Sequence, residues 1–321
     1  MKCIRKTLAL FLAVLMVCAA IGACGTQEAG HSGLAAAPTS VRIKENARVS
    51  YLGPEGTYTE EAAKYFFSSG LFQPKASVPD ALADLADGNA DYAVIPQENT
   101  LGGAVTNYVD ALIAGKDIYV IGEVILPISQ TLMGLPGTTL EEIRTVCSHA
   151  QGIVQSAAWR QEHLPNAVTQ EMSSTAAAAS YVAESGDRTI AAIAAPGAAP
   201  LYGLEILAEN VQITDSNKTR FYVLSSSRLK EEGKAQTQAL FIADCPAERI
   251  DDIIVRIHKS GVELVTLHDR PEGSALGRYR YILEVTKADG ISDKLIANLE
   301  TVPELRCLGS FNVLIKSGGK P

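Results

Sequence analysis

The chain has 321 residues, 47% of them hydrophobic, which is enough for two domains with ordinary cores. Its formal net charge is −8, and no basic run follows residue 44. Because nucleic-acid phosphates are bound by clustered Lys and Arg, this composition argues against a nucleic-acid partner.

Residues 1–24 have the layout of an export signal, with three cations at Lys2, Arg5 and Lys6 before an apolar run. The run ends in "IGAC", which resembles the lipobox of bacterial lipoproteins and predicts a lipid anchor on Cys24. A short transmembrane anchor is the alternative. Residues 25–47 are small and polar, and we expect a flexible tether. The protein is thus expected outside the cytoplasm on a membrane, or in the cytoplasm if the signal is not used.

Residues 48–227 alternate between strand and helix patterns, which predicts an α/β domain with a mainly parallel sheet. Thr57 with Glu60 and Ser148 with Gln151 form predicted capping boxes, and Ser173 or Ser174 is expected to cap a later helix. The expected strands cover residues 48–53, 90–96, 119–128, 189–195 and 217–225, with a strand leading into a helix over 145–164. The other expected helices cover 81–88, 102–113 and 173–184.

A polar linker is expected at residues 228–238, followed by a second domain over 239–315. Its predicted elements are strand 239–244, helix 248–260, strands 262–268 and 278–286, helix 291–300 and strand 306–314. This β-α-β-β-α-β order is ferredoxin-like, for which we expect an antiparallel sheet with strand order 4-1-3-2.

Four turns rich in Ser, Thr or other polar residues join a strand to a helix, at residues 53–58, 96–103, 148–151 and 173–176. Helix N-termini bind anions through free N–H groups and the helix dipole. With "KTR" at 218–220 they predict a small anionic ligand, whose carboxylate Arg220 could bind bidentately. The chain lacks a phosphate loop, a dinucleotide fingerprint, a nucleophile elbow and any metal-ligand spacing of Cys or His, so no metal is predicted.

Five segments, in order, resemble motifs of the prephenate dehydratase family over residues 48–315. They are "YLGPEGTYTEEAA" (51–63), "IPQENTLGG" (95–103), "SHAQ" (148–151), "SSTAAAA" (173–179) and a long segment over 198–224 that ends in "TRFYVL". The chain departs from the family's usual residues at Gly102, Gly103 and Ala104, where Glu-Gly-Ser is usual, and at Ala150, where Pro is usual.

The resemblance implies a two-lobed catalytic domain like a periplasmic binding protein, which converts prephenate to phenylpyruvate without a cofactor. It implies that Thr219 assists departure of the ring hydroxyl. The residues it implies for binding the substrate are Arg220, Asn99, Thr100, Thr57, Gln151, Ser174 and Thr175. The alternative function is a non-catalytic extracytoplasmic lipoprotein that binds a small aromatic or dicarboxylate ligand.

The second domain resembles an ACT domain, which in this family senses phenylalanine. Only the Arg-Pro of the family's Glu-Ser-Arg-Pro effector motif is retained, at Arg270 and Pro271. The resemblance also implies a homodimer or homotetramer. In a 4-1-3-2 sheet the end of the first strand lies beside the start of the fourth, so a disulfide between Cys245 and Cys307 is a further expectation.

Overall fold

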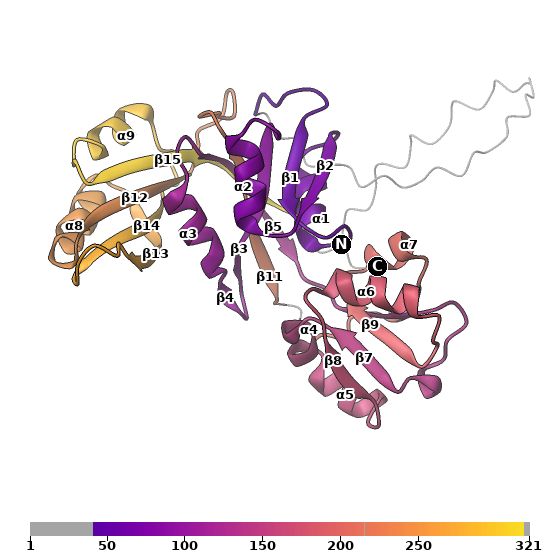
Figure 1. Ribbon diagram of the computed structural model, residues 1–321. Helices are drawn as coiled ribbons and strands as arrows, with labels where there is room; N and C mark the ends of the chain where they lie inside the picture. Colours follow the sequence, from indigo (N-terminus) through magenta and orange to yellow (C-terminus); the bar gives the residue numbers. More distant parts are fainter. Residues whose placement is uncertain (1–40, 215, 318–321) are drawn as a thin grey trace, which may run out of the picture. The chain divides into compact units, whose positions relative to one another are not determined.

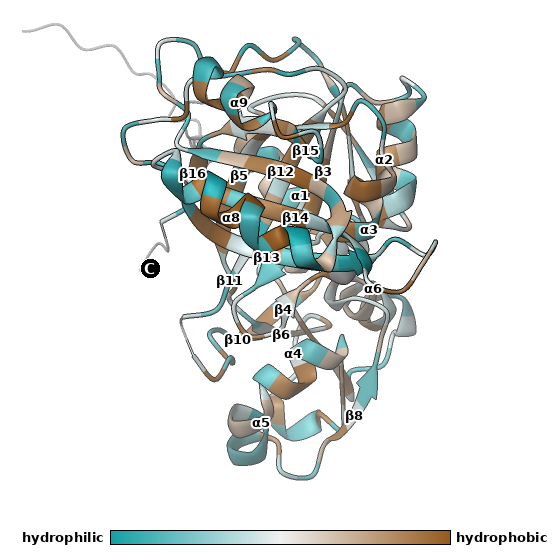
Figure 2. Cartoon of the chain, turned by 90° about the vertical axis from the view of Figure 1, so that its left-hand side faces the viewer, coloured by the Kyte–Doolittle hydropathy of each residue, from teal (hydrophilic) through white to brown (hydrophobic). Residues whose placement is uncertain are grey.

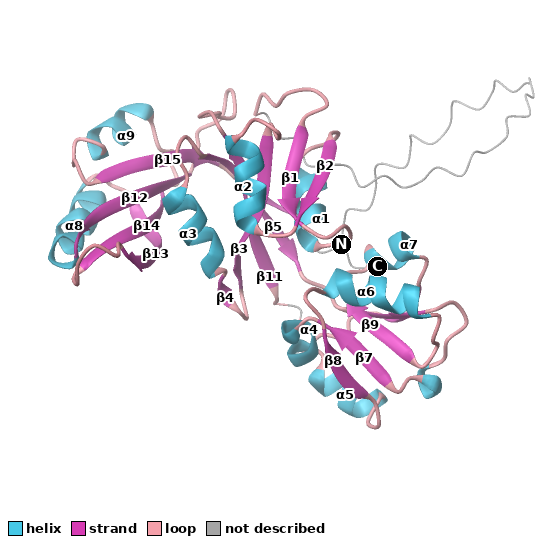
Figure 3. Ribbon diagram, viewed as in Figure 1, coloured by secondary structure: helices cyan, strands magenta, loops and turns pink. Residues whose placement is uncertain are grey.

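The computed structural model describes residues 41–214 and 216–317 (Figure 1). Cys24, the predicted signal and most of the predicted tether lie outside these residues. The strands form three separate sheets, and Figure 3 shows each sheet with its own helices. Within the described part of the chain, no helix has the length and apolar character needed to cross a membrane.

The first lobe is a mixed seven-stranded sheet of order β16-β5-β11-β3-β1-β2, with β4 paired to β3. Its strands are β1 (Arg48–Leu52), β2 (Leu71–Lys75), β3 (Tyr92–Asn99), β4 (Gly103–Ala104), β5 (Tyr119–Pro127), β11 (Lys218–Ser225) and β16 (Val313–Ile315). Its helices are α1 (Tyr58–Phe66), α2 (Val78–Ala86) and α3 (Thr106–Ala114).

The sheet of the first lobe is covered on both faces, because consecutive apolar residues of β3 and β11 are buried on the two sides of the sheet. On β11, Phe221 and Val223 pack with α1, whereas Tyr222 and Leu224 pack with α2 and α3. The prediction of a mainly parallel sheet is only partly right. β1 is parallel to β2 and β3, but β11 runs antiparallel between β3 and β5.

The second lobe is a five-stranded sheet of order β10-β6-β9-β7-β8. Its strands are β6 (Thr131–Gly134), β7 (Thr145–Ser148), β8 (Val168–Glu171), β9 (Ile190–Ala194) and β10 (Glu205–Ala208). Its helices are α4 (Ala150–Gln155), α5 (Ala157–His163), α6 (Thr175–Ser185) and α7 (Ala198–Tyr202), with a 3-10 turn η1 (Leu140–Glu142). The chain enters this lobe after β5 and leaves it before β11, so two segments join the lobes, and the backbone N–H of Ile128 donates to the carbonyl of Asn217 between them (2.9 Å).

The C-terminal domain has the predicted β-α-β-β-α-β order, and its sheet order β13-β14-β12-β15 confirms the expected 4-1-3-2 arrangement. Its elements are β12 (Gln238–Pro246), η2 (Ala247–Arg249), α8 (Ile250–Lys259), β13 (Glu263–Pro271), β14 (Arg278–Thr286), α9 (Asp293–Leu299) and β15 (Leu305–Phe311). One face of the sheet packs on α8 and α9, and the other joins the core that contains α2 and α3. Figure 2 shows hydrophilic residues along much of α8 and apolar residues along the strands behind it.

Two expectations about this domain are wrong. The last predicted strand is divided, and its second part, β16, pairs in parallel with β5 of the first lobe. Cys245 and Cys307 are free thiols. The register places Cys307 opposite Phe241, four residues before Cys245, which is a displacement of about 13 Å along the strand. A disulfide needs Cα atoms within about 7 Å, so this register excludes it.

Candidate active site

Asn99 and Thr219 lie opposite each other at the ends of neighbouring antiparallel strands. The register of β3 and β11 pairs the two residues, and Asn99 Nδ2 donates to Thr219 Oγ1 at 2.9 Å. Asn99 is 9% exposed, so its amide is held inside the protein while Thr219 remains partly exposed. The structure therefore brings together two of the residues predicted for the site.

The second lobe contributes Gln151, whose Nε2 donates to Asn99 Oδ1 at 2.8 Å. Gly102 makes this contact possible, because a Cβ atom at that position would lie 2.5 Å from Gln151 Nε2. The departure from the usual family residue at Gly102 thus leaves room for a direct bond between the lobes.

The hydrogen bonds of Asn99 fix the direction in which Thr219 can donate. Asn99 Oδ1 also accepts from the backbone N–H groups of Leu101 and Gly102, both at 3.0 Å. A backbone N–H can only donate, so the amide oxygen must face these groups and the nitrogen must face Thr219. Thr219 Oγ1 is therefore an acceptor from Asn99, and no acceptor for its own proton is found among the described residues. That proton is available to a ligand.

The hydroxyl of Thr100, which was predicted to bind the substrate, has a structural role. Its Oγ1 donates to the carbonyl of Lys218 at 2.8 Å and accepts from the backbone N–H of Lys218 at 2.9 Å. The hydroxyl is thus used to hold the start of β11 against the end of β3.

The predicted residues Thr57, Ser174 and Thr175 lie at helix N-termini. Thr57 caps α1 by accepting from the N–H of Glu60 at 3.3 Å, and Ser174 caps α6 by accepting from the N–H of Ala177 at 2.9 Å. Thr175 is the first residue of α6, beside Gly152 of α4. Both residues cap their helices as predicted, but the Glu60 carboxylate accepts from the N–H of Gly56 at 2.6 Å, so the expected capping box with Thr57 is not closed. Each helix end directs free N–H groups outward. No recorded contact among the described residues joins Thr57 to Asn99 or Thr219.

The expected capping box at Ser148 is wrong. Ser148 is fully buried, and its Oγ donates to the carbonyl of Ile193 at 2.7 Å. The cap of α4 is His149, whose Nδ1 accepts from the N–H of Gln151 at 3.3 Å. The helix begins one residue later than expected, so Ser148 is still the last residue of β7.

Arg220 does not share a face with Thr219, because successive residues of a strand point to opposite sides of the sheet. Its guanidinium faces the C-terminal domain and binds Glu123 through Nε (2.6 Å) and Nη2 (2.9 Å). It also binds Glu98 at 3.2 Å and Glu284 of β14 at 2.5 Å. The prediction that Arg220 binds a substrate carboxylate is corrected, since three carboxylates of the protein already occupy it. We call Arg220, Glu98, Glu123 and Glu284 the arginine cluster.

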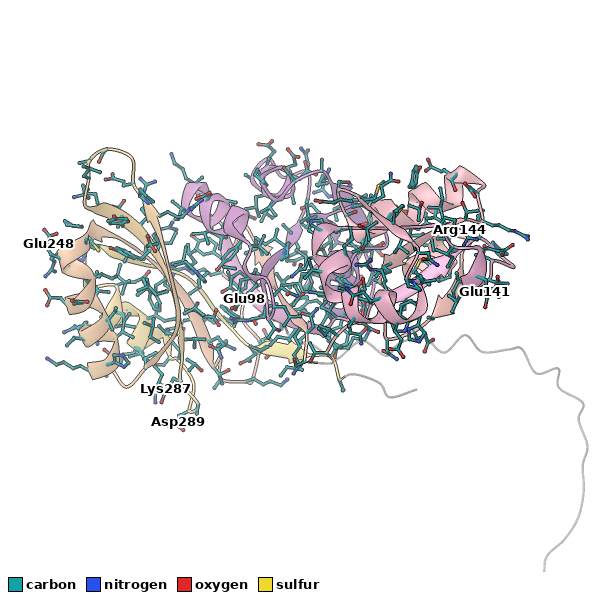
Figure 4. The ribbon with its side chains drawn as sticks, turned by 90° about the horizontal axis from the view of Figure 1, so that it is seen from below. Glu98, Glu141, Arg144, Glu248, Lys287 and Asp289 are labelled. Atoms are coloured by element: carbon teal, nitrogen blue, oxygen red, sulfur yellow. The ribbon has the colours of Figure 1, made fainter. Side chains whose placement is uncertain are left out.

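Two carboxylates of the arginine cluster are buried, since the side chains of Glu123 and Glu284 are 0% and 1% exposed. Burial raises the pKa of Glu123, and the hydrogen bonds and charge of Arg220 oppose that rise. Glu98 is the more exposed member, and Figure 4 shows it far from Glu141 and Arg144 of the second lobe and from Glu248 of the C-terminal domain. Sequence reasoning missed Glu123 and Glu284, which no local motif marks.

The predicted effector residue Arg270 is also engaged inside the chain. Its Nε and Nη2 bind the two carboxylate oxygens of Asp110 on α3, each at 2.5 Å. Pro271 ends β13 and is exposed. In this structure the bidentate face of Arg270 is occupied by a residue of the first lobe.

A hollow of about 490 Å³ lies elsewhere on the molecule, beside Lys44, Asp91 and Ser226. Its lining contains none of the residues predicted for the substrate. Among the described residues no group of three or more His, Cys, Asp or Glu side chains is placed to hold a metal.

The sequence comparisons point to one family. The model of the family described as "Prephenate dehydratase" matches residues 49–228, more than half of the chain. The bifunctional chorismate mutase/prephenate dehydratase of Stutzerimonas stutzeri is 32% identical, over 84% of this chain and 74% of the relative. The prephenate dehydratase of Amycolatopsis methanolica is also 32% identical, over 83% of this chain and 88% of the relative.

Solved structures of two prephenate dehydratases are also similar to this chain. A prephenate dehydratase from Arthrobacter aurescens, in complex with L-Phe, has a TM-score of 0.75 and 30% identity, covering 83% of this chain and 90% of that chain. The prephenate dehydratase of Staphylococcus aureus has a TM-score of 0.68 and 25% identity, covering 83% of this chain and all of that chain. The two-lobed fold and the resemblance to the prephenate dehydratase family are thereby confirmed. This chain belongs to the prephenate dehydratase family.

Proposed function

We propose that this chain catalyses the decarboxylating dehydration of prephenate and that Thr219 is its catalytic residue. The observation that supports this role is the bond from Asn99 Nδ2 to Thr219 Oγ1, which leaves the threonine proton for the substrate. Thr219 donates a hydrogen bond to the ring hydroxyl, and this bond strengthens as negative charge develops on the departing oxygen.

The reaction needs no group beyond those of the chain and solvent. The bond between the ring and its carboxylate breaks, its electron pair enters the ring, and carbon dioxide leaves. The C–O bond breaks at the same time, and the departing hydroxide takes one proton from solvent to become water. The N-termini of α1 and α6 supply N–H groups and positive helix ends for the carboxylates of the dianion. Orientation of the dianion by these groups lowers the barrier.

The direct test is to add prephenate to the purified full chain and to measure the formation of phenylpyruvate. Turnover supports the enzyme. Tight binding of prephenate without turnover contradicts the proposal and favours the alternative, a non-catalytic binding lipoprotein.

We propose further that the C-terminal domain is an ACT domain that binds phenylalanine and joins copies of the chain in a homodimer or homotetramer. Its strand order supports the domain type, and the Arthrobacter relative was crystallised with L-Phe. Because Asp110 occupies Arg270, we expect Asp110→Asn to tighten binding of L-phenylalanine, measured by calorimetry on the full chain. Unchanged affinity would show that Arg270 is not part of the effector site. The oligomer is checked by light scattering with and without the amino acid.

For location, we propose that the protein is exported and anchored by a lipid on Cys24, on the basis of the signal-like residues 1–24. We expect the full chain to enter the detergent phase on phase partition, and Cys24→Ala to remain in the aqueous phase. Partition unaffected by the substitution would contradict lipidation. Cys18→Ala, in the same segment, is the matched control and should leave partition unchanged.

A further inference from the structure

A chain of buried side-chain amides continues from Asn99 away from Thr219. Asn99 Nδ2 donates to Asn217 Oδ1 at 2.8 Å, and Asn217 Nδ2 donates to Gln155 Oε1 at 3.1 Å. Gln130 Nε2 donates to the same Gln155 oxygen at 3.3 Å. We call Asn99, Asn217, Gln155 and Gln130 the amide chain.

Each side-chain amide of these four residues has its orientation set by a neighbouring group. The backbone N–H groups at Leu101 and Gly102 fix the oxygen of Asn99, so its nitrogen must meet an oxygen of Asn217. The nitrogen of Asn217 then points the other way, toward the oxygen of Gln155. If Asn217 could not accept, the nitrogen of Asn99 would lose one of the partners that hold it in line with Thr219.

The amide chain is buried and crosses between the lobes. Asn217 is 1% exposed, and Gln155 and Gln130 are each 4% exposed. Gln155 ends α4 of the second lobe, whereas Asn217 and Gln130 lie on the two segments that join the lobes. Hydrogen bonds in such surroundings are stronger than in water, and an unpaired member is costly.

We propose that Asn217 and Gln155 are positioning residues for the dehydration, which act by holding the Asn99 amide so that Thr219 donates a hydrogen bond to the departing hydroxyl of the substrate. This inference rests on the proposed role of Thr219. Asn217 and Gln155 do not touch the substrate themselves. Their loss should therefore lower the rate of the chemical step and leave the binding of prephenate almost unchanged.

The test is a double-mutant cycle on the full chain, in which kcat and KM for prephenate are measured for four proteins. Asn217→Leu keeps the approximate size of the side chain and removes both hydrogen bonds. We expect it to lower kcat roughly tenfold or more, with KM within about twofold. When Thr219 is already alanine, Asn217→Leu should have almost no further effect on kcat, measured in single turnovers with enzyme in excess.

Two further variants distinguish a specific effect on kcat from a general loss of stability. Gln155→Leu removes the acceptor of Asn217 from another element and should give the same pattern as Asn217→Leu. Gln236→Leu removes a buried amide whose Nε2 binds backbone carbonyls near the linker, and it should leave kcat unchanged. Thermal unfolding of each variant shows whether it is folded.

Three results would overturn the inference. The first is an equal fall in kcat from Asn217→Leu with and without Thr219, which would show that the residue acts by a separate route. The second is an unchanged kcat in both Asn217→Leu and Gln155→Leu. The third is full activity of the single variant Thr219→Ala, which would remove the proposed role of Thr219 and the inference together. In the first two cases loss of activity in Thr219→Ala leaves the proposed function standing.

Discussion

Replacing Thr219 by alanine is expected to lower kcat for prephenate by roughly 10²- to 10³-fold, the usual cost of removing one hydrogen-bond donor to a developing negative charge. The variant loses the hydroxyl that Asn99 holds at 2.9 Å, and the departing oxygen then has no donor from β11. KM should change much less, because the helix N-termini proposed to bind the carboxylates are untouched. Steady-state kinetics on the full chain measures both constants.

Two substitutions make this prediction specific to the hydroxyl at this place. Thr219→Ser keeps a hydroxyl on the same face of β11 and should retain activity within about tenfold. Thr301→Ala removes a hydroxyl that donates to the carbonyl of Asn298 in the C-terminal domain, and it should not change kcat. If Thr219→Ala and Thr219→Ser are equally inactive, the role assigned to the hydroxyl is incorrect.

Replacing Arg220 by leucine is expected to lower the free energy of unfolding by about 3–5 kcal/mol, the usual cost of leaving buried charges without their partner. The guanidinium is the cation shared by Glu98, Glu123 and Glu284, and the last two are buried. Since Glu284 belongs to β14 and Glu123 to β5, the loss should loosen the contact between the first lobe and the C-terminal domain. Denaturant unfolding measures the change.

Arg280→Leu is the matched control for this effect. Arg280 pairs with Asp244 at 3.1 Å on the surface of the C-terminal sheet, where an ion pair contributes about 0–1 kcal/mol. An equally small effect of both substitutions would show that the arginine cluster does not stabilise the fold.

The loss caused by Arg220→Leu should also depend on pH. Burial raises the pKa of Glu123 and Arg220 opposes this rise, so removing Arg220 raises that pKa further. A raised pKa means that the folded protein favours the protonated carboxyl. The free energy of unfolding therefore falls as the pH rises from the pKa of this group in the unfolded chain through its pKa in the folded protein. The difference between Arg220→Leu and the unchanged chain should therefore be larger near pH 8 than near pH 5.

Much of the local structure could be predicted from the sequence, because its causes are local. Thr57 and Ser174 cap helices where the pattern placed them, and strand β14 has the predicted bounds. The order of elements after residue 238 was sufficient to predict the 4-1-3-2 sheet.

The placement of Thr219 and Arg220 on opposite faces of the sheet could also have been predicted from the sequence. In a strand, Asn217 and Thr219 share one face, and Arg220 shares the other with Tyr222. Applying this alternation to "NKTRFY" would have separated the site from the arginine cluster and drawn attention to Asn217.

The partners of Arg220 and Arg270 could not be predicted in this way. Glu284 lies 64 residues from Arg220, and Asp110 lies 160 residues from Arg270. Such pairs depend on how the C-terminal sheet packs on α3 and β11, which no spacing in the sequence encodes. The strands β2 and β8 were missed for another reason, since their exposed residues lack the apolar alternation on which the prediction relied.

The strand β16 ties the last residues of the described chain to the first lobe. It pairs with β5 at Glu123, Val124 and Ile125, and the side chain of Lys316 reaches Glu61 on α1 at 2.7 Å. The catalytic region and the C-terminal domain are therefore not interchangeable modules. A chimera with another C-terminal domain must supply its own edge strand for β5, and a truncation before residue 313 exposes that edge of the catalytic sheet to pairing with other chains.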